Sequence, residues 1–198
     1  MVLVAMALIN PKPIPKDKTI NELAKFFNET LGFCPNSILT MQIKPKLAEA
    51  FINLNMAVMQ NEAQISSEFK RLIAFISSSA SGCAYCQAHT IRAAERYGAN
   101  EERLKNVACF ETSDSFTRKE KSALKFAQES STSPVNLTKE TTDELKKYWN
   151  EIEIIELTSV IALFGFLNRW NDIMATPIEE QALQSATLLI QNWDKGKH

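Results

Sequence analysis

Apolar residues recur at helical spacing along almost the whole chain, and no segment alternates apolar and polar residues as a β-strand would. In residues 44–61, for example, Leu47, Phe51, Leu54 and Val58 share one face of a helix. The same pattern predicts helices at 19–32, 66–81, 83–98, 101–110, 120–131, 139–149, 153–174 and 177–193. We therefore expect an all-α orthogonal bundle of about eight helices.

Polar residues mark several of the predicted helix ends. Thr19 with Glu22 and Thr117 with Glu120 have the spacing of capping boxes, in which each side chain bonds a free backbone N–H at a helix start. Residues 153–174 form the most apolar stretch, which predicts a central helix, and Gly165 would let a neighbour approach it closely.

The N-terminal segment differs from the rest because closely spaced prolines in "PKPIPKDK" cannot continue a helix. We expect residues 1–18 to form an extended arm that covers the core or reaches a second subunit, and residues 19–198 to form a single all-α domain. The apolar start "MVLVAMALIN" has no basic residues before it and is short for a signal peptide, so it is interpreted as mature protein.

Composition narrows the possible partners. The 198 residues include 22 basic and 23 acidic side chains, a formal net charge of -1, which gives no basic excess for binding nucleic acid or a membrane surface. No stretch approaches the roughly 20 apolar residues that span a bilayer. The four cysteines are unevenly spaced, unlike a disulfide framework, so we expect a cytoplasmic protein in a reducing compartment.

The candidate chemistry lies in "SGCAYCQAHT", residues 81–90. If a helix begins near Gly82, Cys83 and Cys86 lie in its first turn, where free N–H groups and the helix dipole favour a thiolate. Residues three apart are neighbours on a helix, so Cys83 meets Cys86 and Cys86 meets His89. We predict Cys86 as the nucleophile, Cys83 as the resolving thiol and His89 as the proton carrier, although Cys83 is nearer the helix terminus and could exchange roles with Cys86.

This motif, with "GFCPNSILTM" before it and "ALFGFLNRWND" after it, resembles the carboxymuconolactone decarboxylase / alkyl hydroperoxidase D (AhpD-like) superfamily, in particular its longer peroxidase-related members. The resemblance covers most of residues 30–175. It implies an all-α homo-oligomer that needs no cofactor and reduces hydroperoxides or small disulfides, with an external thiol regenerating the cysteine pair. The alternative is a redox-sensing or ligand-binding homo-oligomer on the same fold.

The chain departs from that family pattern at two places. His89 lies three residues after the second cysteine, where the family histidine more often lies four after it, and Arg71 stands where related peroxidases have a relay glutamate. Glu68 or Glu156 could replace that carboxylate, although Arg71 could instead pair with Glu68 on the same helix.

The remaining cysteines and the polar residues near position 170 can be interpreted as structural or as functional. The other two cysteines, Cys34 and Cys109, are expected to be small core residues; a zinc site that recruits them or His89 is the weaker alternative, so we predict no metal. Arg169, Asn171 and Asp172 either form a polar helix end or contribute to the site.

Overall fold

The computed structural model describes residues 7–13, 18–60 and 64–198, and within them it contains helices and no strand. The helices are α1 (Lys18–Thr30), α2 (Asn36–Met41), α3 (Pro45–Met59), α4 (Ser67–Ala80), α5 (Ala84–Arg96), α6 (Glu101–Asn106), α7 (Arg118–Ser130), α8 (Lys139–Tyr148), α9 (Glu151–Met174) and α10 (Glu180–Leu189). A short 3₁₀ turn, Val107–Cys109, follows α6. The predicted all-α class is confirmed.

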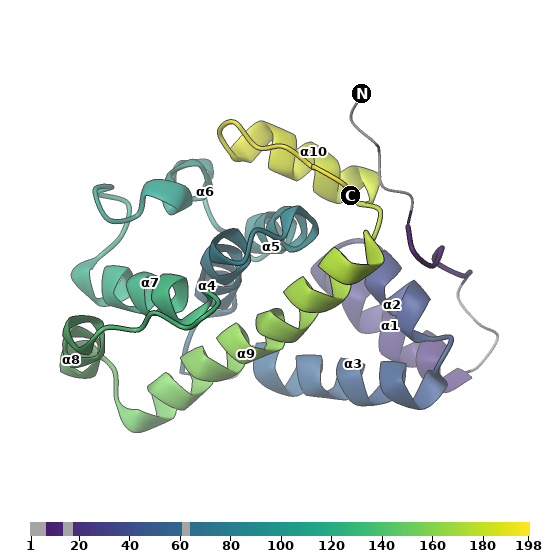
Figure 1. Ribbon diagram of the computed structural model, residues 1–198, viewed down its shortest axis with the longest axis horizontal. Coiled ribbons are helices and arrows are strands. Elements are labelled where there is room, and N and C mark those ends of the chain that lie inside the picture. The colour runs from purple at the N-terminus through teal and green to yellow at the C-terminus, as the bar shows by residue number, and fades with distance from the viewer. Residues whose placement is uncertain (1–6, 14–17, 61–63) are drawn as a thin grey trace.

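Helices α4 and α5 form the centre of the bundle (Figure 1). They pack against each other, and α9 runs along both of them as a long diagonal helix. Helix α10 packs on α5, α7 packs on α4 and α9, and α3 packs on α1 and α9. The start of α5 therefore lies where several helices meet, and that position buries the cysteine motif.

Helix α4, rather than α9, is the most completely buried element. Every residue from Phe69 to Ser78 is buried. Helix α9 is apolar on two faces. One face is buried in the bundle, and the other, which carries Ile152, Ile155 and Phe166, is exposed. The predicted close approach at Gly165 is wrong, because nothing in the described residues lies within 4 Å of the position its Cβ would take.

Two local features differ from the sequence prediction. The short helix α2, after Pro35, was not predicted, because six residues are too few to establish a helical period. The helix predicted for 101–110 ends earlier, at Asn106, where the chain tightens into the 3₁₀ turn. The Thr117–Glu120 capping box is confirmed, with both of its hydrogen bonds formed. The side chain of Thr19 is outside the described residues.

The described part of the arm lies against the bundle. The N–H of Leu8 donates to the carbonyl of Met174 at 2.9 Å, and the N–H of Lys12 donates to the carbonyl of Leu39 at 3.1 Å. Residues 7–13 thus contact α2 and the end of α9, whereas residues 1–6 and 14–17 of the predicted arm lie outside the described residues. None of the described helices has the length and apolar character needed to cross a membrane.

Candidate active site

The two cysteines lie at the start of α5, as the sequence predicts. Gly82 has a φ of +73°, which turns the chain sharply after α4, and Cys83 is the N-cap residue of α5. Cys86 lies in the first turn of this helix. Both thiols are free, almost fully buried and hydrogen-bonded to each other. The predicted neighbour relation between Cys83 and Cys86 is therefore present in the fold.

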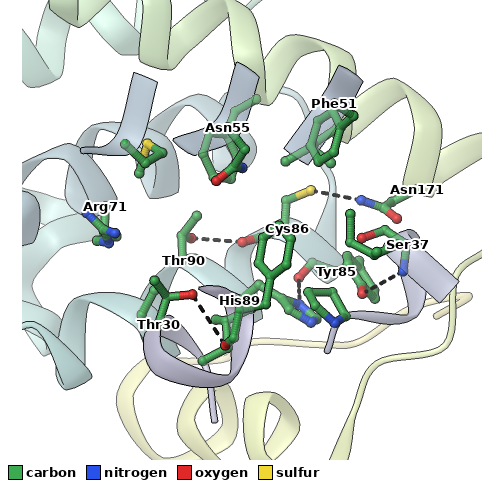
Figure 2. Close-up of a pocket in the computed structure, with 18 of the residues that line it drawn as sticks. Thr30, Ser37, Phe51, Asn55, Arg71, Tyr85, Cys86, His89, Thr90 and Asn171 are labelled. Carbon is green, nitrogen blue, oxygen red and sulfur yellow. Dashed lines mark hydrogen bonds between the residues drawn. The ribbon is translucent and has the colours of Figure 1, made fainter. Parts of the chain in front are cut away.

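Cys86 lines an apolar cavity of about 70 Å³ (Figure 2). Aromatic side chains supply much of its wall, namely those of Phe26, Phe27, Phe51, Phe164 and Tyr85. Cys83 does not line this cavity. The side-chain amide of Asn171 on α9 donates to Sγ of Cys86 at 3.4 Å, as the dashed line in Figure 2 shows. This hydrogen bond holds the Cys86 sulfur at the cavity wall.

His89 also lines the cavity, stacked on the ring of Tyr85. Its Nδ1 lies 2.7 Å from the backbone carbonyl of Tyr85; since a carbonyl only accepts, Nδ1 carries a hydrogen. Its Nε2 lies 2.8 Å from Oε2 of Glu179, although the two atoms are poorly aligned for a hydrogen bond. This close imidazole–carboxylate contact places His89 and Glu179 where a proton can pass between them.

Glu179 is the carboxylate that the sequence analysis did not find. It precedes α10, and its Oε1 accepts hydrogen bonds from the hydroxyl of Tyr85 at 3.2 Å and from the backbone N–H of Asn36. The two predicted substitutes are engaged elsewhere. Glu68 pairs with Arg103 at 3.0 Å, and Glu156 pairs with the buried Lys70 at 2.8 Å. The expectation that one of them serves His89 is wrong.

A second imidazole–carboxylate pair lies beside Cys83. Nε2 of His198 is 3.3 Å from Oδ1 of Asp172, and its Nδ1 is 3.1 Å from the carbonyl of Thr176. The ligand atoms of Cys83, Asp172 and His198 all lie within 4.8 Å of one another. Of the polar residues at the end of α9, Asn171 and Asp172 thus both contact the cysteine motif or its histidine partner, whereas the side chain of Arg169 is exposed.

The two thiols have opposite acidities. The hydrogen bond from Cys86, followed by that from His198, lowers the pKa of Cys83 to about 6 despite burial. Burial raises the pKa of Cys86 well above its usual value, and its hydrogen bond to Cys83 acts in the same direction. Burial opposes protonation of His198, but its contacts with Cys83, Thr176 and Asp172 outweigh that effect and raise its pKa. The resting pair therefore has a Cys83 thiolate that accepts a hydrogen bond from the neutral Cys86 thiol.

The remaining cysteines are not drawn into this site. Cys34 is partly buried, and burial raises its pKa to about 12, whereas Cys109 is exposed and is not the core residue predicted. Among the described residues, the one group of three side chains suited to hold a metal ion is Cys83, Asp172 and His198, which includes neither of these cysteines nor His89. The zinc alternative in its predicted form is therefore not supported by the fold.

The fold and this geometry define a helical protein with a buried, asymmetric thiol pair beside an apolar cavity. Residues 45–129 match the carboxymuconolactone decarboxylase family. The apo structure of the debrominase Bmp8 is 38% identical, with a TM-score of 0.87, and the match covers 92% of this chain and 97% of that one. The chain belongs to the carboxymuconolactone decarboxylase family.

Further comparisons extend this result. A cysteine-to-alanine variant of Bmp8 in complex with 2,3,4-tribromopyrrole is also 38% identical, with a TM-score of 0.88 and coverage of 93% of this chain and 98% of that one. A peroxidase-related protein from Ralstonia eutropha JMP134, described as having the alkylhydroperoxidase AhpD core, is 18% identical, with a TM-score of 0.75 and coverage of 89% and 96%; it shares the fold. No match was found among curated proteins.

Proposed function

We propose that this protein is a thiol-dependent reductase in which Cys86 removes an electrophilic atom from a small substrate and Cys83 completes the reduction. The observation that carries the proposal is that Cys86 alone of the pair lines the aromatic cavity, while it is hydrogen-bonded to the more acidic Cys83. The aromatic walls of the cavity favour a ring, and because its volume of about 70 Å³ is below the roughly 150 Å³ that holds benzene in a protein core, the walls must move apart to admit one. The likeness to Bmp8 supports a halogenated aromatic as the first substrate class.

The chemistry balances with the groups present. The sulfur of Cys86 bonds the halogen as its own proton passes to Cys83, and the electron pair of the carbon–halogen bond stays on carbon. The carbon takes up the proton held by His89 and Glu179. Cys83 then attacks Cys86, the halide leaves with its electron pair, and the proton of Cys83 is released on the side of His198. The products are the dehalogenated ring, halide and a Cys83–Cys86 disulfide.

An external thiol, protein or small dithiol, must reduce this disulfide before the next turnover. We accordingly propose a reducing compartment, the cytoplasm, as the place of action. We also propose that the protein forms a homo-oligomer, because Leu54 of α3 and Phe166 of α9 line an apolar groove on the outside of the bundle and are largely exposed. No cofactor is needed, because the two thiols supply both electrons.

Hydroperoxide reduction is the second candidate, favoured by the Cys-x-x-Cys-x-x-His motif that the chain carries. In that reaction Cys86 attacks the terminal oxygen, the alkoxide takes a proton to become an alcohol, and Cys86 becomes a sulfenic acid. Cys83 then displaces water to form the same disulfide. Both reactions use the same residues and differ in the atom that sulfur attacks.

Turnover with matched substrates tests the proposal. Bromide release from 2,3,4-tribromopyrrole and loss of cumene hydroperoxide are each followed with excess dithiothreitol, for the natural protein and for Cys86→Ser. We expect bromide release that the variant reduces by at least about a thousandfold, since serine is a far weaker nucleophile toward halogen. A faster reaction with the hydroperoxide would favour the second candidate. Equal rates for protein and variant with both substrates would refute the proposal.

A further inference from the structure

One cationic side chain lines the same cavity as Cys86 and takes no part in the proposed thiol chemistry. Arg71, on α4, has an exposed fraction of 3%, and it lies at one end of the residues drawn in Figure 2, with Cys86 between it and Asn171 in that view. Burial lowers its pKa to about 10, so the guanidinium stays charged at neutral pH. Arg71 therefore places a positive charge in the wall of the apolar cavity.

The charge of Arg71 is not balanced by an acid within the described part of the chain. Its Nη1 donates to the carbonyl of Ser67 at 2.7 Å, and the guanidinium lies 3.8 Å from the ring centre of Tyr97. Its buried Nε has no hydrogen-bond partner, and the predicted pair with Glu68 is not formed because Glu68 binds Arg103. Buried charges in proteins are normally paired, so a guanidinium with unused donors beside a cavity is suited to a charged ligand.

The neighbouring polar side chains differ in whether they are already engaged. The hydroxyls of Thr30 and Thr90 donate to carbonyls of their own helices. Asn55 of α3 lines the cavity too, is buried, and forms no side-chain hydrogen bond among the described residues. Arg71 and Asn55 thus offer N–H donors to whatever fills the cavity, and donors of this kind complement an oxygen or nitrogen anion.

We propose that Arg71 forms an anion-binding subsite in the wall of this cavity, and that the substrate is a small aromatic compound bearing an ionised acidic group. The ring then occupies the apolar part of the cavity, and the anionic group turns toward Arg71 while the atom to be removed faces Cys86. This inference rests on the proposed function for its view of the cavity as the substrate site. It adds a requirement that neither candidate reaction imposes by itself, namely a negative charge on the substrate.

Titration calorimetry with two probes of the same shape tests the subsite, because it measures their affinities and needs no turnover. Benzoate and benzamide have nearly the same shape and differ in charge. We expect reduced natural protein to bind benzoate at least about tenfold more tightly than benzamide, because a charge-assisted hydrogen bond is stronger than a neutral one. The preference should disappear in Arg71→Met. The control Arg96→Met removes a guanidinium that is outside the cavity, and it should retain the preference.

Each result decides the question. Equal binding of the two probes to the natural protein, or binding of neither, overturns the subsite, and this arm does not depend on whether Arg71→Met folds. A preference for benzoate that persists in Arg71→Met also overturns it. If benzoate is preferred through Arg71 while neither bromopyrrole nor hydroperoxide is turned over, the subsite stands and the proposed reaction fails.

Discussion

The two sides of the cysteine pair differ in almost every physical property. Cys86 lines an apolar cavity, its pKa is raised by burial, and its hydrogen bond from Asn171 comes from a neutral amide. Cys83 lies away from the cavity, its pKa is lowered, and its neighbours are an imidazole and a carboxylate. The helix start is common to both thiols, so the helix dipole alone cannot explain the difference. Side chains from other elements create it.

In the proposed mechanism this asymmetry gives the two sulfurs different tasks: Cys86 meets the substrate, and Cys83 accepts and later releases the proton of Cys86. A nucleophile with a raised pKa stays protonated until its neighbour accepts the proton. Because oxidants react with thiolates, a protonated Cys86 should react with them slowly between turnovers. Each of the following predictions removes one part of the difference between the two sides.

Replacing Cys83 should have the largest effect on continuous turnover. In Cys83→Ser, Cys86 loses the base that accepts its proton, so it takes the atom from the substrate more slowly, and no second thiol lies within reach to form the disulfide. We expect one equivalent of dehalogenated product per protein in a rapid-mixing experiment, and a steady-state rate at least about a hundredfold lower. Turnover that equals that of the natural protein would show that Cys83 is not the resolving thiol.

Replacing Glu179 should have the next largest effect on turnover, because it removes the carboxylate that contacts His89 beside the cavity. Glu179→Gln keeps the hydrogen-bond acceptor for Tyr85 but cannot share a proton with His89 as a carboxylate does. General acid–base catalysis contributes about 10²- to 10⁴-fold, so we expect kcat to fall by roughly a hundredfold. The matched control is Glu156→Gln, which changes an acid outside the cavity. A similar loss of kcat in both variants would point to general destabilisation instead.

The sequence predicted the fold well, because caps and helical periodicity are local signals. The "SGCAYC" stretch also predicted correctly that two thiols meet at a helix start, since that geometry depends only on neighbouring residues. Glu179 could not be predicted in the same way. It lies 90 residues after His89, in a loop before α10, and no local pattern marks it as a partner.

The role of His198 was hidden for a similar reason. Asp172 lies on α9 and His198 after α10, and both are outside residues 45–129, which match the family. The packing of α9 on α5 brings Asp172 close to Cys83, and the chain after α10 returns to place His198 beside both. One signal was available in retrospect: "NRWND" ends an apolar helix with polar residues, and the functional interpretation of Asn171 and Asp172 fits their contacts in the fold.

Replacing His198 should have the smallest effect, and one that depends on pH. The Cys83 thiolate faces Cys86, His198 and Asp172, and His198 is the cation among these when protonated. Because a thiolate is favoured by a nearby cation, His198→Gln should raise the pKa of Cys83 above its value of about 6, by roughly one unit. The thiolate of the natural protein is lost as the pH falls through about 6, so the variant should lose it, and with it activity, at a higher pH.

Absorbance of the thiolate at 240 nm, titrated in the natural protein and in His198→Gln, measures this shift directly, and Cys83→Ser assigns the signal. At pH 6 we expect the variant to react several-fold more slowly than the natural protein, with the two rates converging above about pH 8, where both proteins hold the thiolate. Lys197→Gln provides the matched control, since Lys197 also contacts Asp172 but is not among the groups that shift Cys83. A pH profile that does not move in His198→Gln would mean that Cys86 alone makes Cys83 acidic, and that the second imidazole serves only to hold the chain in place.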